Sequence, residues 1–219
     1  MGDFWEDITT CPLCGKNFAY TKIKYDSVIV KKYEDDLRPV YLGPNPLNFE
    51  ILTCPKCGFT YYSSKNENIL KKMTKEQKIE LKSYLKLTKE KLGKIDNSKD
   101  KTIEFLKKQY AQAIVIYNII VQPSIVAKSM IRLAWLFREE NKIKEELKLL
   151  LGAVDVLEKN FENLDSDDAL ILYYFFKGYV NLRIGNKKTA KEFFNKLISR
   201  YKKYNSPYVK KAEYLKGEL

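Results

Sequence analysis

The sequence predicts a mostly α-helical protein that begins with a small β-containing module and continues as an array of antiparallel helix hairpins. Three observations predict this fold class. The motif Cys-Pro-x-Cys-Gly occurs twice near the N-terminus, the apolar period changes from about two to about 3.6 near residues 63–68, and the later connections are short. We therefore expect two domains, a four-cysteine module over residues 1–68 and a helical repeat domain over residues 69–219.

Short strands are predicted in the first module. Residues 23–33 mix β-branched and aromatic side chains with charges, and residues 49–53 form a second such stretch. Residues 38–46 between them contain three prolines, which exclude a helix and predict an extended loop.

Helices are predicted in the second domain. Thr74-Lys75-Glu76-Gln77 has the pattern of a capping box, and the helix that it begins is expected to end at Gly93. Asp96-Asn97-Ser98 is expected to open the next helix, which Pro123 ends. Further helices are predicted over residues 124–140, 143–163, 166–184, 187–204 and 207–216.

The composition indicates a soluble globular chain. Lys and Arg number 40 against 28 acidic residues, for a net charge of +12, and histidine is absent, which removes the usual general base and nitrogen metal ligand. The most apolar run, residues 110–121, is much shorter than the ~20 residues of a membrane-spanning helix. No secretory signal is recognised at the N-terminus, so we expect a cytoplasmic protein without membrane association.

The cysteines predict one structural zinc ion per chain, held by Cys11, Cys14, Cys54 and Cys57. In each motif the proline and glycine favour a tight turn that points both thiolates at one ion, and two such knuckles complete a closed tetrahedral site. A redox pair is the less favoured interpretation, because a thioredoxin-like motif would be single and lie on a βαβ unit. Iron remains an alternative to zinc, since thiolates bind both metals.

The positive charge is not spread evenly. Residues 1–70 hold eight basic and nine acidic residues, whereas residues 71–110 hold thirteen lysines and six acidic residues, a net charge of +7. Such a run is usually a solvated helix face, but binding of RNA or DNA through residues 71–108 is an alternative function.

The helical domain resembles the tetratricopeptide repeat, in which small residues let two helices of a hairpin approach closely. Two copies are visible, and a partial earlier one precedes them. The first copy departs from the repeat pattern at Glu146, where the repeat prefers alanine, and the second departs at Asn181, where it prefers an aromatic residue. The positions that carry the two copies are Leu133, Ala134, Phe137, Asn141, Ile143, Leu150 and Ala153, then Tyr174, Gly178, Gly185, Ala190 and Phe194.

If this register holds, aromatic and arginine side chains line a groove between the hairpins. Such side chains dominate binding energy at protein interfaces, and this set suits a peptide with acidic and apolar residues. The alternative is that Trp135, Phe175 and Tyr179 belong to the core. The predicted groove residues are Lys128, Trp135, Arg138, Phe175, Tyr179 and Arg183.

The order of motifs along the whole chain resembles the bacterial domain-of-unknown-function family 2225. The resemblance is carried by the two Cys-Pro-x-Cys-Gly knuckles, by Pro123-Ser124 and by residues 132–138, Arg-Leu-Ala-Trp-Leu-Phe-Arg. Between the knuckles it is carried by Arg38, Pro39-x-Tyr41 and Asn45-Pro46. It implies a zinc-knuckle head on a tetratricopeptide-like tail, and it supplies no activity.

Two functions follow from the sequence. The first is a non-enzymatic adaptor with a structural zinc module and a helical groove for a protein or peptide partner. The second is a nucleic-acid-associated regulator that uses residues 71–108. An enzyme is not expected, because the glycines form no phosphate-cradling loop and no nucleophile has an evident base beside it.

Overall fold

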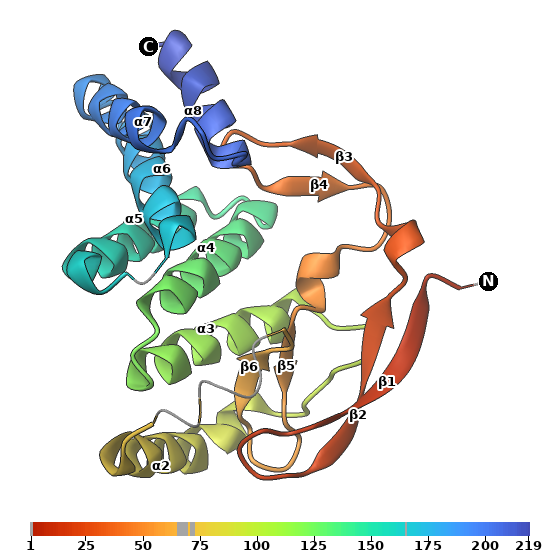
Figure 1. Cartoon of the computed structure of the whole chain (residues 1–219). Coiled ribbons are helices and arrows are strands. Elements are labelled where there is room, and N and C mark those ends of the chain that lie inside the picture. Colours follow the sequence, from red (N-terminus) through yellow and green to blue (C-terminus); the bar gives the residue numbers. More distant parts are fainter. Residues whose placement is uncertain (1, 65–69, 71–72, 165) are drawn as a thin grey trace. The chain divides into compact units, whose positions relative to one another are not determined.

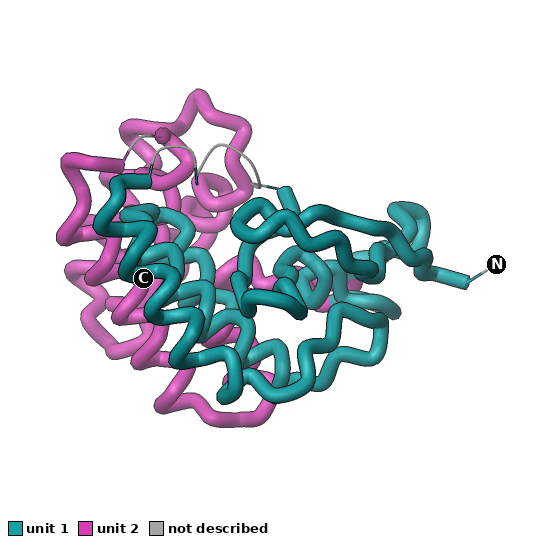
Figure 2. Tube along the Cα trace, turned by 90° about the horizontal axis from the view of Figure 1, so that it is seen from below, with its two compact units in different colours: residues 1–30, 41–132 teal, residues 31–40, 133–219 magenta. Residues whose placement is uncertain are grey.

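The computed structural model of this chain describes residues 2–64, 70, 73–164 and 166–219. The chain forms two compact units: unit 1 comprises residues 1–30 and 41–132, and unit 2 comprises residues 31–40 and 133–219 (Figure 2). The predicted fold class is confirmed, because short β hairpins precede a helical array that makes up most of the described chain (Figure 1). The predicted boundary after residue 68 lies outside the described residues, and the compact units are divided at other points.

Two antiparallel hairpins form the β part of unit 1. Strands β1 (Phe4–Thr10) and β2 (Asn17–Ile23) pair along their full length, and strands β5 (Ile51–Thr53) and β6 (Thr60–Tyr62) form the second hairpin. Strands β1, β4 and β6 have no counterpart among the predicted strands, and β2 shares only Ile23 with one of them. The predicted strand over residues 23–33 is interrupted by a 3-10 turn, η1 (Tyr25–Ser27), and a second turn, η2 (Pro46–Asn48), precedes β5.

Helices α2 (Lys75–Leu92) and α3 (Ile103–Ile119) follow in unit 1. The predicted capping box of α2 is present, because the backbone N–H of Gln77 donates to Thr74 Oγ1 at 3.2 Å and Gln77 Oε1 accepts from the Thr74 N–H at 2.9 Å. Helix α3 begins later than the sequence predicts. Thr102 is its N-cap, and Asp96-Asn97-Ser98 is a loop in which Asn97 is buried. Helix α4 (Pro123–Glu139) begins in unit 1 and ends in unit 2.

Unit 2 is built around one apolar helix. Helix α6 (Asp167–Arg183) packs against α5 (Ile143–Lys159), α7 (Lys187–Tyr201) and α8 (Pro207–Gly217), and the 3-10 turn η3 (Phe161–Asn163) follows α5. The close approach of α6 and α7 requires Gly178, since a Cβ there would lie 2.5 Å from the ring of Phe194. Residues 31–40 of unit 2 carry most of β3 (Val30–Tyr33) and β4 (Pro39–Tyr41), which form a two-stranded sheet, whereas Val30 and Tyr41 themselves fall in unit 1.

Candidate metal centre and acidic-turn site

The two cysteine motifs are the loops of the two hairpins in unit 1. Cys11 to Gly15 connect β1 to β2, and Cys54 to Gly58 connect β5 to β6. The two loops have the same hydrogen bonds, because the glycine N–H of each donates to the carbonyl oxygen of its first cysteine, at 2.9 and 2.8 Å. Both glycines have positive φ, +71° and +75°, a conformation that side-chain-bearing residues rarely adopt. The repeated proline and glycine of the sequence therefore produce two copies of one turn.

All four thiols lie together in this structure. Their Sγ atoms are within 4.8 Å of one another, with Cys11 Sγ 3.7 Å from Cys57 Sγ and Cys14 Sγ 3.6 Å from Cys54 Sγ. A tetrahedral site with metal–sulfur bonds of about 2.3 Å has sulfur atoms about 3.8 Å apart, so the spacing suits one ion bound by all four. Cys11 and Cys54 are buried, whereas Cys14 and Cys57 are partly exposed, and all four are free of disulfides.

The thiols influence one another's ionisation. The hydrogen bond between Cys11 and Cys57 lowers the pKa of the Cys11 thiol to about 5, whereas burial raises the pKa of Cys54 to about 11. The pKa of Cys57 is also raised, chiefly by its hydrogen bond with Cys11. A divalent cation is the group that would stabilise all four thiols as thiolates.

Side chains from outside the motifs hold the second knuckle in place. The Asn97 side chain accepts from the Thr53 N–H at 3.2 Å and donates to the Thr53 carbonyl at 2.8 Å. The Asn97 carbonyl oxygen also accepts from the Thr21 N–H of β2, so this one residue bonds to both hairpins. From α3, Gln112 Nε2 donates to the Gly58 carbonyl at 2.9 Å. Sequence reasoning missed these residues, because nothing local distinguishes a buried asparagine or glutamine from an exposed one.

Lysine side chains border the metal centre. A cavity of about 310 Å³ has Leu13, Cys14 and Cys57 on one wall and Lys82, Lys86 and Lys89 of α2 on the other. These three lysines belong to the predicted nucleic-acid-binding segment 71–108, of which residues 71–72 lie outside the described residues. A four-thiolate site that holds a divalent ion carries about two negative charges. The positive charges of the three lysines therefore lie beside a site of opposite charge.

The predicted groove residues are divided between the units. Lys128 lies in unit 1, where its Nζ contacts Glu50 at 3.1 Å and lies 4.4 Å from the ring centre of Tyr62. The other five lie in unit 2. Three of them, Trp135, Phe175 and Tyr179, are at most 5% exposed, which agrees with the alternative that these rings belong to the core.

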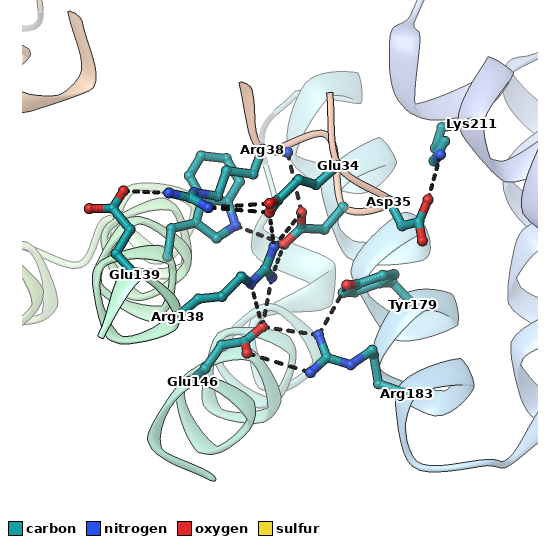
Figure 3. Close-up of polar contacts among 11 residues, drawn as sticks. Glu34, Asp35, Arg38, Arg138, Glu139, Glu146, Tyr179, Arg183 and Lys211 are labelled. Atoms are coloured by element: carbon teal, nitrogen blue, oxygen red, sulfur yellow. Dashed lines mark hydrogen bonds and ion pairs between the residues drawn. The ribbon is translucent and has the colours of Figure 1, made fainter. Parts of the chain in front are cut away.

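Two of the groove residues of unit 2, Trp135 and Arg138, hold an acidic turn of the same chain, residues 33–38, between β3 and β4 (Figure 3). Asp36 is fully buried and accepts from Trp135 Nε1 at 2.8 Å. The guanidinium of Arg138 binds Asp36 through two hydrogen bonds, at 2.5 and 3.1 Å, and also binds Glu34. On the flank of the turn, Lys211 Nζ of α8 lies 2.7 Å from Asp35.

A second buried carboxylate, Glu146 of α5, completes this cluster. Glu146 accepts from Arg138 at 2.6 and 2.9 Å and from Arg183 at 3.0 Å, and Arg183 also donates to the hydroxyl of Tyr179 at 3.1 Å (Figure 3). Burial alone would lower the pKa of Arg138, but its bonds to Asp36 and Glu146 raise that pKa instead, so the arginine is charged. The departure from the repeat pattern at Glu146 was the sequence signal for this cluster. The local sequence signal for the turn was the run of three acidic residues Glu34-Asp35-Asp36.

In the part of the chain that the structure describes, no helix has the length and apolar character needed to cross a membrane. No curated protein and no solved structure matches this chain. A family model described as "Uncharacterized protein conserved in bacteria (DUF2225)" matches residues 4–217, which include both cysteine knuckles and the acidic turn. The chain therefore belongs to the DUF2225 family, the domain-of-unknown-function family that its motifs resemble.

Proposed function

We propose that this protein is a non-enzymatic, zinc-binding protein-interaction module of the cytoplasm. In this proposal the zinc ion is structural, the helices of unit 2 are tetratricopeptide-like hairpins, and their groove binds an acidic segment of a partner protein. The observation that carries the proposal is that Trp135 and Arg138 hold the buried carboxylate of Asp36.

The spacing and the chemistry of the cysteines support zinc. Four sulfur ligands at tetrahedral spacing, two of them buried, are typical of structural sites, which keep no open position for a substrate. Zinc would join the β1–β2 hairpin to the β5–β6 hairpin and so stabilise unit 1. Free thiols of this kind are typical of reducing compartments. Metal analysis of the purified protein distinguishes zinc from iron.

The charge of the groove supports an acidic partner. Arg138 and Arg183 meet the carboxylates of the turn and of α5, and Arg138 binds Asp36 in the two-bond geometry by which arginine recognises carboxylates. A partner segment with the same acidic pattern would make these bonds in place of the turn. In this arrangement Phe175 and Tyr179 belong to the core behind the arginines, since both are buried and the Tyr179 hydroxyl accepts from Arg183 at 3.1 Å.

A peptide titration tests this proposal. The probe is a fluorescent peptide with the sequence of residues 31–40, KKYEDDLRPV, and the control is the same composition in scrambled order. The full chain carrying Glu34→Gln and Asp36→Asn, whose own turn is weakened, should bind the probe at least about tenfold more tightly than the wild type. Adding Arg138→Gln should abolish binding. Equal, weak binding of probe and scrambled peptide to the Glu34→Gln, Asp36→Asn protein would contradict the proposal.

A second candidate function, binding of RNA or DNA through residues 71–108, is favoured by the exposed lysines of α2. Lys82, Lys86 and Lys89 lie close enough together to line one cavity. If they contact phosphates, replacing all three by glutamine should reduce the slope of log affinity against log salt by about 2 to 3. A slope near zero for the wild-type protein would reject this candidate.

A further inference from the structure

Unit 2 contains an aromatic cavity that the proposed function does not use. The cavity, of about 410 Å³, opens beside η3, α6 and α7. Its walls include Phe161, Tyr173, Tyr174 and Phe193, whose neighbouring ring centres lie 5.2 to 6.4 Å apart. This volume lies within the range of about 300–1,000 Å³ that small-molecule sites occupy. Aromatic rings that border an open cavity provide stacking surfaces for a flat ring of a ligand.

The positive charge at this cavity is only partly neutralised. Arg200 of α7 lies 5.6 Å from the ring centre of Tyr174 and donates to its hydroxyl, and no carboxylate of the described residues pairs with it. Lys196, one turn earlier, lies 4.8 Å from the ring centre of Phe193 and pairs with Glu192. An arginine without a carboxylate partner, beside aromatic rings, favours a ligand with an anionic group such as phosphate.

A carboxylate also lines the cavity. Glu158 of α5 accepts from the Tyr173 hydroxyl at 3.2 Å and from Lys177 at 2.7 Å. A carboxylate has about four lone-pair positions, so Glu158 retains capacity to accept from an amino group of a ligand. Helices α5 and α7 both pack against α6 (Figure 1), so Glu158 and Arg200 reach the α6 rings from different helices. A ligand that fits has a flat ring, an amino group and an anion.

We propose that this cavity binds a nucleotide. The base stacks on the aromatic rings, its exocyclic amine donates to Glu158, and its phosphate binds Arg200. A free mononucleotide and a nucleotide within a single strand offer the same chemistry, so both are probes. The proposal needs neither the metal centre nor the acidic-turn groove, and its outcome is independent of theirs.

Calorimetric titration of the full-length protein tests the proposal. The probes are AMP, GMP, CMP and UMP, together with adenosine, inorganic phosphate and a single-stranded oligonucleotide of ten adenylates. AMP, GMP or CMP should bind with a Kd below about 1 mM. Adenosine, phosphate and UMP, which lacks the exocyclic amine, should bind at least about tenfold more weakly. Arg200→Gln should weaken nucleotide binding by about tenfold or more, and the matched control Lys203→Gln should leave it unchanged.

A second variant, Phe193→Ala, separates stacking from charge, and thermal unfolding of each variant shows whether it is folded. If the protein binds the oligonucleotide but not AMP, and Arg200→Gln abolishes this binding, the result would support a site for a nucleotide within a single strand. Absence of binding by every probe at about 1 mM would overturn the proposal, and so would binding that both Arg200→Gln and Phe193→Ala leave unchanged. Equal affinity for UMP and CMP would overturn the contact assigned to Glu158.

Discussion

Replacing Arg138 by methionine removes a cation that contacts both Asp36 and Glu146, the two buried carboxylates among the described residues of unit 2. Methionine keeps the length and apolar character of the arginine stem, so the main loss is charge and hydrogen bonding. Four hydrogen bonds to Asp36 and Glu146 disappear, and both carboxylates are 0% exposed. Breaking a buried ion pair by removing one partner costs about 3–5 kcal/mol.

The remaining partners place this cost at the lower end of the range. Asp36 keeps its bond from Trp135 Nε1, and Glu146 keeps Arg183. We therefore expect Arg138→Met to lower the free energy of unfolding of unit 2 by about 3 kcal/mol. Since small proteins have urea m values of about 1–3 kcal/mol per molar, the midpoint of unfolding should fall by about 1–3 M.

Tryptophan fluorescence in a urea titration measures this change. The chain has two tryptophans, so a Trp5→Phe background leaves Trp135 as the reporter, and Trp135 itself binds the acidic turn. Arg200→Met is the matched control: this exposed arginine contacts a tyrosine hydroxyl, and its loss should cost less than about 1 kcal/mol. The triple variant that adds Asp36→Asn and Glu146→Gln to Arg138→Met should recover at least half of the lost free energy of unfolding. In this variant no buried charge remains unpaired. A loss below about 1 kcal/mol, or a triple variant no more stable than the single one, would refute this reasoning.

Three further predictions concern the rest of the chain. Purified protein should contain one zinc ion per chain. Cys14→Ser should abolish metal binding and unfold unit 1, while the fluorescence of Trp135 in unit 2 stays native. Full zinc content in this variant would contradict a four-cysteine site. Gly178→Ala should destabilise unit 2 by about 1–3 kcal/mol, because its Cβ would clash with the buried Phe194; a melting temperature equal to that of Gly217→Ala would be the contrary result. Burial lowers the pKa of Lys101 to about 8, below its value of 10.5 in the unfolded chain. The unfolded state therefore binds more protons above pH 8, and the free energy of unfolding should rise by about 2 kcal/mol between pH 7 and 9.5. Lys101→Met should remove that rise, and a pH dependence equal to the wild type would assign it to other groups.

Features set by neighbours in sequence could be predicted. The cysteine knuckles depend on five consecutive residues each, and their two copies form the same turn. The capping box of α2 is equally local, because it involves only four consecutive residues. The short connections between later helices are local too, because Asn141 and Gly185 at the helix ends have positive φ. Strand β1 escaped prediction because its residues are mostly exposed on both faces, so no apolar alternation marks them.

Features set by distant partners could not be predicted. The sequence predicts that Asp96-Asn97-Ser98 opens a helix, but the Asn97 side chain bonds to Thr53, a strand residue 44 positions earlier, and the chain there is a loop. The same holds for Asp36, which lies 99 positions from Trp135 and 102 from Arg138. In each case a polar residue is buried because a segment distant in the sequence satisfies its hydrogen bonds. The residues next to it in the sequence do not indicate which segment that is.

The position of the acidic turn in the chain determines how strongly it competes with a partner. The turn is joined at both ends to unit 1, through Val30 and Tyr41, so it cannot diffuse away from the helices that bind it. A short tether gives an effective concentration of about 1 mM, so a partner peptide with an intrinsic Kd of about 10 µM would bind the wild type with an apparent Kd of about 1 mM. Weakening the turn should therefore improve peptide affinity by up to about a hundredfold. A partner that binds the wild type tightly must offer contacts beyond the acidic pattern, since that pattern alone only exchanges one set of carboxylate bonds for another.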